Sequence, residues 1–212
     1  AIVGNHTRVL VSDLGGRAGM SLKAREFGVD LDDRAAAEPS DRLKHLAAEG
    51  YQFEAADASL ELLMRAASGW EQPYFRLEGY RVTTYHRNAL RGGAPIEDGE
   101  SIVDTEASIK VWVGEERLVA IGEGNGPVNA LDAALRQVLT QRYPELGRIH
   151  LTDYRVRILD TEADTDAVVR VLIDSTDGEL AWTTIGVSTN IIEASWQALT
   201  DALVWGLLHS GQ

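Results

Sequence analysis

An internal repeat in the second half of the chain limits the possible folds more than any other feature. Residues 79–82 resemble 153–156, residues 109–113 resemble 169–173, and a pattern of glycine followed by alanines at 122–135 recurs at 186–199. Each copy shows the period of three strands and then that of one helix. Three strands have one face to cover, and one amphipathic helix covers about that area. The repeat therefore predicts two βββα layers.

The residues before the repeat carry helical signals instead. Apolar side chains between positions 56 and 67 recur at helical spacing and form one stripe. The predicted fold class is therefore α+β, with a helical linker subdomain over 1–68 and a pseudo-symmetric domain over 69–212. Within that domain the repeats cover about 74–145 and 148–210, and residues 88–105 are expected to form a long exposed loop.

The helix of the second copy is apolar over more than one face, with Trp196 and Trp205 added to its aliphatic residues. One face should cover its own sheet. The rest should meet either the sister repeat or another subunit, unless the two tryptophans only fill the core. This excess of apolar surface predicts a homodimer formed through residues 70–212.

Charge and composition exclude several classes of partner. The chain has 20 Lys and Arg against 33 Asp and Glu, a net charge of −13, which repels nucleic-acid phosphates and anionic lipids. No apolar run approaches the ~20 residues of a membrane span, and the first residues do not resemble a signal peptide. We therefore expect no nucleic-acid partner, no membrane partner and a cytoplasmic location.

The motifs of catalysis are missing from the sequence. There is no cysteine, the five histidines lie far apart, and no Gly-x-Ser-x-Gly elbow is present. We therefore expect no catalytic residue, no metal site and no cofactor site in this chain, which disfavours a self-contained enzyme. The first methionine is Met20, so we interpret the chain as part of a longer protein.

The segment 122–130, GEGNGPVNA, is the strongest candidate for a binding site. Its glycines end a strand, and Pro127 suits the first position of a helix because it lacks an N–H group. Free N–H groups and the positive end of the helix dipole favour a small anion near Gly124, Asn125 and Gly126. The alternative is a tight turn with no ligand.

Three long segments resemble a known family in the correct order. These are GEGNGPVNALDAAL at 122–135, HLTDYRVRILD at 150–160 and GVSTNIIEASWQAL at 186–199. They resemble the C-terminal regulatory domain of the α-isopropylmalate synthase superfamily, and within it the citramalate synthases. RVLVSDLGGR at 8–17 and GYQFEAADASLELLMR at 50–65 are similar to the stretch that follows the catalytic barrel in that family.

The resemblance implies the role of a regulatory region. Members of the family condense acetyl-CoA with a 2-oxo acid on a metal-dependent TIM barrel, and their regulatory domain dimerises and binds a branched-chain amino acid as feedback inhibitor. The divalent metal and acetyl-CoA would belong to the barrel, which this chain lacks. Since the helical subdomain would then have lost one neighbour, we expect residues 1–68 to pack loosely.

The resemblance also implies how the effector is held. The N–H groups around Gly124, Asn125 and Gly126 would bind its carboxylate. The apolar wall for its side chain would come from the residues Val128, Leu151, Tyr154 and Ile158. The alternative is that these residues form core between a sheet and a helix. A side chain at Gly126 would then crowd both the turn and the ligand. Isoleucine is the expected effector, and the alternatives are leucine or a dimerisation module without a working effector site.

Overall fold

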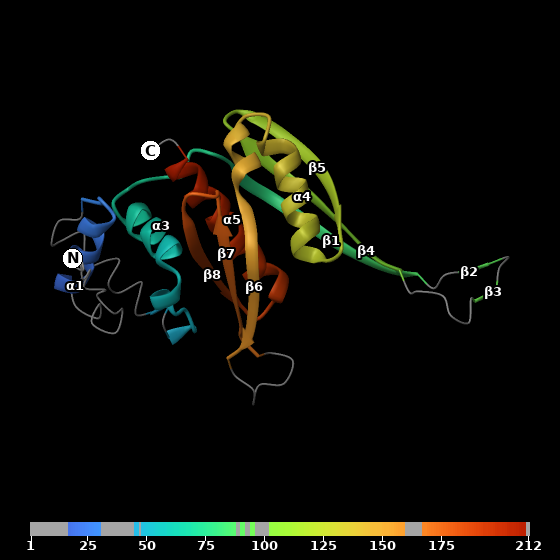
Figure 1. The fold of residues 1–212 in the computed structure, drawn as a ribbon, viewed down its shortest axis with the longest axis horizontal. Coiled ribbons are helices and arrows are strands. Elements are labelled where there is room, and N and C mark those ends of the chain that lie inside the picture. Colours follow the sequence, from blue (N-terminus) through green and yellow to red (C-terminus); the bar gives the residue numbers. More distant parts are fainter. Residues whose placement is uncertain are drawn as a thin grey trace, which may run out of the picture. The chain divides into compact units, whose positions relative to one another are not determined.

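The computed structural model describes residues 17–30, 45–46, 48–87, 90–91, 94–95, 102–159 and 167–210 (Figure 1). These residues form two compact units. Residues up to Gln72 and Leu151–Trp205 form the first, and Pro73–His150 with the residues from Gly206 onward form the second. This grouping differs from the expected boundary after residue 68. The division into a linker subdomain and an effector-binding domain stays a prediction.

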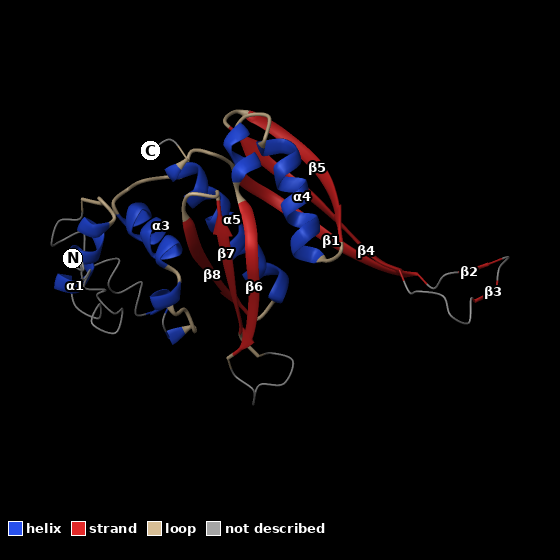
Figure 2. Ribbon diagram, viewed as in Figure 1, coloured by secondary structure: helices blue, strands red, loops and turns tan. Residues whose placement is uncertain are grey.

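The first repeat folds as βββα. Strands β1 (Arg76–Arg87), β4 (Ile102–Val113) and β5 (Glu116–Gly124) form an antiparallel sheet in the order β1-β4-β5. Helix α4 (Pro127–Leu139) covers one face of it, as Figure 2 shows, and the short helix η3 (Pro144–Arg148) follows. Within the predicted loop, β2 (Leu90–Arg91) pairs with β3 (Ala94–Pro95). Strand β4 begins at Ile102, so residues 102–105, which were predicted to belong to the loop, form part of a strand.

The second repeat has the same order of elements. Strands β6 (His150–Ile158), β7 (Val169–Thr176) and β8 (Ala181–Ser188) form a sheet in the order β6-β7-β8, followed by helix α5 (Ile191–His209). Because both copies run strand, strand, strand, helix, the structure confirms the predicted α+β class and its two βββα repeats.

Two equivalent glycines explain why each helix packs so closely on its sheet. A Cβ at Gly122 of β5 would collide with the backbone of Ala130 and Ala134 in α4. A Cβ at Gly186 of β8 would collide in the same way with the backbone of Ala194 in α5. The Gly and Ala positions that align in the sequence therefore make the same helix-to-sheet contact in both repeats.

The described helices before the repeats contribute buried residues to a cluster with the second repeat. The loose packing expected of residues 1–68 stays a prediction, because part of that range lies outside the described residues. Helix α1 (Arg17–Glu26), the short helix η2 (Phe53–Ala55) and helix α3 (Asp57–Ala67) precede the repeats. Leu60 and Met64 are fully buried in one cluster with Ile185 and Val187 of β8. The predicted apolar stripe of α3 is therefore confirmed, but it faces the second repeat, which the local sequence pattern does not specify.

Polar side chains hold the same segment against α5. Tyr51 donates to Gln197 at 2.9 Å, Ser59 donates to Asp201 at 2.6 Å, and Trp205 donates to Glu61 at 2.7 Å. Gln197, Asp201 and Trp205 are spaced by four residues and so lie on one stripe of α5. We call these six residues the α3–α5 seam. Helix α5 therefore has two packing partners, its own sheet and the helical segment that the seam attaches to it.

The seam also closes the free edge of β8. The backbone N–H of Ile185 donates to Ser59 at 3.0 Å, and that of Val187 donates to Gln197 at 3.0 Å. An unpaired strand edge otherwise presents N–H groups to any passing strand. Trp205 further stacks on Trp182 with ring centroids 4.9 Å apart, and Trp196 is buried.

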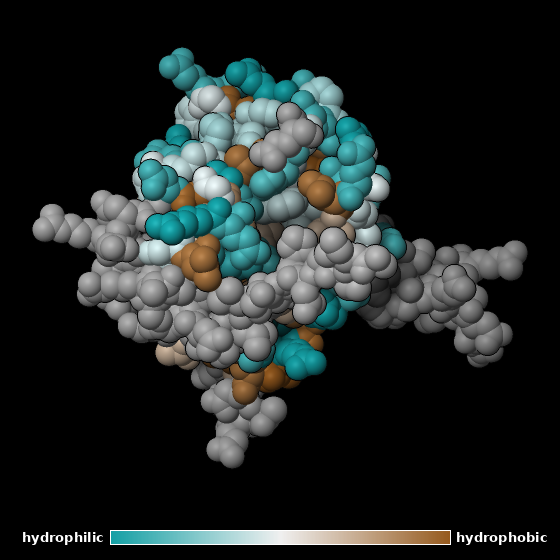
Figure 3. Space-filling view, turned by 60° about the vertical axis from the view of Figure 1, so that its left-hand side comes forward, coloured by the Kyte–Doolittle hydropathy of each residue, from teal (hydrophilic) through white to brown (hydrophobic). Residues whose placement is uncertain are grey.

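Among the residues that Figure 3 colours, the hydrophobic ones form small patches between hydrophilic ones. Among the described helices, none is long and apolar enough to cross a membrane.

Candidate functional site

The turn between β5 and α4 leaves the start of the helix without a side-chain cap. Gly126 is the N-cap residue, its backbone is extended (φ −175°), and Pro127 follows at the first helical position. The nearest side-chain contact is made by Asn129, whose Oδ1 accepts the N–H of Asn125 at 3.3 Å. N–H groups at an uncapped helix start attract negative charge.

The corresponding turn of the second repeat is closed by its own side chain. Asn190 Oδ1 accepts the N–H groups of Ile192 at 2.8 Å and Glu193 at 3.3 Å. This is the usual capping arrangement, which satisfies the first donors of a helix. Of these two strand-to-helix turns, therefore, the one at Gly124–Gly126 lacks a side-chain cap and the one at Asn190 has one.

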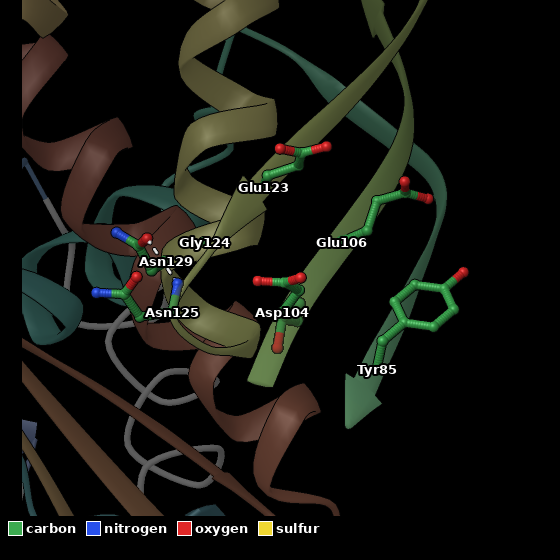
Figure 4. A pocket seen from close by; sticks show the side chains of 8 residues that line it. Tyr85, Asp104, Glu106, Glu123, Gly124, Asn125 and Asn129 are labelled. Atoms are coloured by element: carbon green, nitrogen blue, oxygen red, sulfur yellow. Dashed lines mark hydrogen bonds between the residues drawn. The ribbon is translucent and has the colours of Figure 1, made fainter. Parts of the chain in front are cut away.

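An open hollow of about 500 Å³ lies beside this turn, and its wall is acidic (Figure 4). It is lined by Tyr85, Asp104, Thr105, Glu106, Glu123, Gly124, Asn125 and Asn129. The strand register places Tyr85 opposite Asp104 and Glu106 opposite Glu123. Because the chain has 33 acidic residues, sequence reasoning had no reason to select these three carboxylates. The sheet register brings them together next to the predicted turn.

Gly126 has a different role from the expected one. A Cβ at Gly126 would meet no atom within 4 Å, so the prediction that it would crowd the turn is wrong. The extended φ of Gly126 suits any residue. Gly124 is the restricted position, because a Cβ there would collide with Asn129 Oδ1 and approach the Ala130 nitrogen at 2.7 Å. Val128 is half-buried in the first turn of α4.

The remaining predicted residues lie on β6, in the other compact unit. Tyr154 is 40 % exposed and Ile158 is 60 % exposed. Alternate residues of a strand share a face, so Val156 belongs with them, whereas Leu151 points to the opposite face. Ile191, at the start of α5, is also exposed. Sequence reasoning missed Val156 and Ile191.

A hydroxyl pair connects β6 to the N-terminal part of α5. Tyr154 Oη and Ser195 Oγ are 2.7 Å apart, and Ser195 donates to the Ile191 carbonyl at 2.6 Å. The tyrosine is therefore the donor in the pair. We call Tyr154, Val156, Ile158 and Ile191 the β6 patch. It combines exposed aliphatic surface with one polar group, which is typical of sites that bind a small amphiphilic molecule.

Comparison with known proteins identifies the family of the chain. Residues 54–205 match the LeuA allosteric (dimerisation) domain. The chain is 47 % identical to an (R)-citramalate synthase of Streptomyces coelicolor, covering 99 % of the chain and 38 % of that protein. It is 46 % identical to an (R)-citramalate synthase of Synechocystis, with 97 % and 37 % covered. It is also 29 % identical to a 2-isopropylmalate synthase of Aquifex aeolicus, with 93 % and 34 % covered.

These matches agree with the resemblance found in the sequence. The chain spans somewhat more than a third of the length of these relatives. The domain match covers the α3 segment and most of both repeats. The chain therefore belongs to the LeuA allosteric (dimerisation) domain family.

Proposed function

We propose that this chain is the regulatory region of a citramalate-synthase-type acyltransferase, that it forms a homodimer, and that it binds isoleucine as a feedback inhibitor. The observation that carries the proposal is the β6 patch, where three aliphatic side chains and one tyrosine are exposed. Contiguous apolar surface of this kind marks binding sites for a ligand or a partner.

The chemistry of an amino acid matches the two candidate surfaces. Its aliphatic side chain suits the β6 patch, where Ile158 is 60 % exposed. In the other compact unit, the uncapped start of α4 suits a carboxylate, and the acidic hollow next to it suits an ammonium group. The two surfaces are alternative candidates for the effector site, and each can be tested by its own variant.

Isoleucine is preferred over leucine because of the relatives. The chain is 47 % identical to a citramalate synthase and 29 % identical to a 2-isopropylmalate synthase. The two ligands differ only in the position of one methyl group, which changes binding by ~1–3 kcal/mol.

We assign acyl transfer, with its divalent metal and acetyl-CoA, to a catalytic barrel outside this sequence. A cytoplasmic location also stays a prediction.

Isothermal titration of the chain with isoleucine, leucine and valine tests the proposal. We expect isoleucine to bind about ten-fold more tightly than the other two. Ile158→Ala should weaken binding by roughly 1–2 kcal/mol because it removes apolar contact, and Val128→Ala tests the turn in the same way. Leu180→Ala is the control, since Leu180 is 45 % exposed in the turn between β7 and β8.

Each other outcome selects an alternative. If leucine binds most tightly, the chain would instead be the leucine-responsive regulatory region of an α-isopropylmalate synthase. No binding of any of the three amino acids, with the fold intact, would leave a dimerisation module without an effector site. Unchanged affinity in both Ile158→Ala and Val128→Ala would move the site elsewhere.

A further inference from the structure

Two arginines face each other on neighbouring strands of the second sheet. The N–H of Leu159 donates to the carbonyl of Val168 at 2.8 Å, where β6 and β7 meet. In an antiparallel pair this contact places Arg157 opposite Arg170, two residues back on each strand. Opposite residues share a face, and like charges directly opposite each other destabilise a sheet.

Arg170 is buried, and none of the residues that the structure describes pairs with its charge. Only 8 % of the residue is exposed, and its Nε makes no hydrogen bond. Burial lowers the pKa of Arg170, and the neighbouring charge of Arg157 lowers it further. Among the described residues, no carboxylate forms an ion pair with either guanidinium. By contrast, Arg155 on the same face of β6 donates to both carboxylate oxygens of Asp174 at 2.8 Å.

Two arginines that face each other destabilise the folded chain. The pair is also unexpected in a chain where 33 acidic residues outnumber 20 basic ones. An unpaired buried charge is among the most expensive features in a protein, and removing one partner of a buried pair costs several kcal/mol. An anion that binds both guanidinium groups removes this destabilisation. Arg157 is exposed, so an anion can reach the pair from solvent.

We propose that Arg157 and Arg170 form a binding site for an oxyanion, the carboxylate or phosphate group of a small molecule. Guanidinium groups bind both by paired N–H donors in a planar fork. Odd-numbered residues of β6 point away from the face that carries Tyr154 and Ile158. The site is therefore separate from the β6 patch, and it does not depend on the proposed isoleucine site.

Thermal unfolding in different anions tests the proposal. The parent chain is unfolded in sodium phosphate, in sodium succinate and in sodium chloride. All three solutions have the same ionic strength of about 10 mM, so that general salt effects stay small. A ligand that binds only the folded chain raises its melting temperature. We expect phosphate, succinate or both to raise it by a few degrees over chloride. Phosphate alone would assign a phosphate group, and succinate alone would assign a carboxylate.

Two variants separate the site from a general effect. Arg157→Gln should abolish the anion-dependent shift, and in chloride it should melt at or above the parent temperature because one of two like charges is gone. Arg155→Gln is the matched control and should keep the shift, since that arginine is already paired with Asp174. Backbone amide shifts in ¹⁵N spectra should move around Arg157 and Arg170 on addition of the stabilising anion.

Two results would overturn the proposal. One is equal melting of the parent chain in all three salts, as expected if the acidic residues of the sequence at 160–166 already supplied the charge. The other is an anion-dependent shift that persists unchanged in Arg157→Gln, which would locate the anion elsewhere.

Discussion

At the residue scale, the glycines of the first repeat have unequal roles. A Cβ at Gly122 would collide with the Ala130 carbonyl oxygen and the Ala134 nitrogen, which belong to the helix backbone and cannot give way. We expect Gly122→Ala to destabilise the chain by about 1–3 kcal/mol. Gly126→Ala should change stability by less than about 0.5 kcal/mol, because its Cβ would have open space. Urea unfolding of both variants and the parent measures this, and equal stability of the two variants would contradict the packing argument.

The carboxyl group of Asp201, a half-buried residue, makes stability depend on pH. Burial raises the pKa of Asp201 from 3.8 to about 7, although the hydrogen bond from Ser59 acts in the opposite direction. The folded chain therefore holds a proton that the unfolded chain releases. The stability that the folded chain gains from holding this proton is fully present below about pH 4 and is lost as the pH rises to about 7.

We therefore expect Asp201→Asn to stabilise the chain at high pH. The amide stays neutral and its oxygen still accepts from Ser59, so the variant should gain about 1–3 kcal/mol over the parent at pH 8 and less at pH 5. Chemical unfolding at both pH values gives this difference. Asp153→Asn is the control, because the side chain of Asp153 is 53 % exposed. A difference between Asp201→Asn and the parent that is the same at both pH values would contradict the raised pKa.

The turn at Gly124–Gly126 also shows what a sequence can tell about single residues. The glycines and Pro127 located the strand end and the helix start correctly, because their backbone preferences are local. The assignment of the crowded position to Gly126 was wrong. Crowding depends on which atoms of α4 lie over each glycine, and Gly122 and Gly124 are the covered ones.

At the element scale, the repeats could be predicted and the docking of α3 could not. Alternation along the strands and helical spacing in α4 and α5 are local patterns, so they indicated both βββα copies. The partner of α3 is more than a hundred residues away, in β8 and α5. No periodicity encodes such a contact. The same limit explains why the acidic hollow, made by three strands and a turn, escaped detection.

The buried face of α3 gives a prediction for this docking. Leu60 is fully buried among the side chains of η2, α3 and β8. Leu60→Ala should lower the free energy of unfolding by about 2–5 kcal/mol, since it leaves a cavity. Leu22→Ala in α1 is the matched control, because Leu22 is 53 % exposed and should lose less than about 0.5 kcal/mol. Hydrogen exchange should show α3 protected as strongly as β8, and rapid exchange throughout α3 would support the expectation of loose packing.

At the scale of the whole molecule, the two repeats differ in how their sheets are covered. In the second repeat, Ile185 on β8 is buried under α3. Its counterpart in the first repeat is Ile121, at the same offset as the two equivalent glycines. Ile121 and Val119 lie on the face of β5 that points away from α4, and each is 56 % exposed. The first repeat thus leaves open the face that the second repeat covers.

This open face gives the last prediction. The family is described as a dimerisation domain, and dimers of this kind bury apolar surface that a single chain leaves exposed. We expect sedimentation at micromolar concentration to show a dimer of the 23.1 kDa chain. Ile121→Asp should weaken dimerisation at least ten-fold, because it places a charge in the interface. Leu180→Asp should leave the dimer unchanged, since Leu180 lies in a turn at the end of a different sheet. A monomeric parent would contradict the homodimer, and a dimer that tolerates Ile121→Asp would show that another surface holds the two chains together.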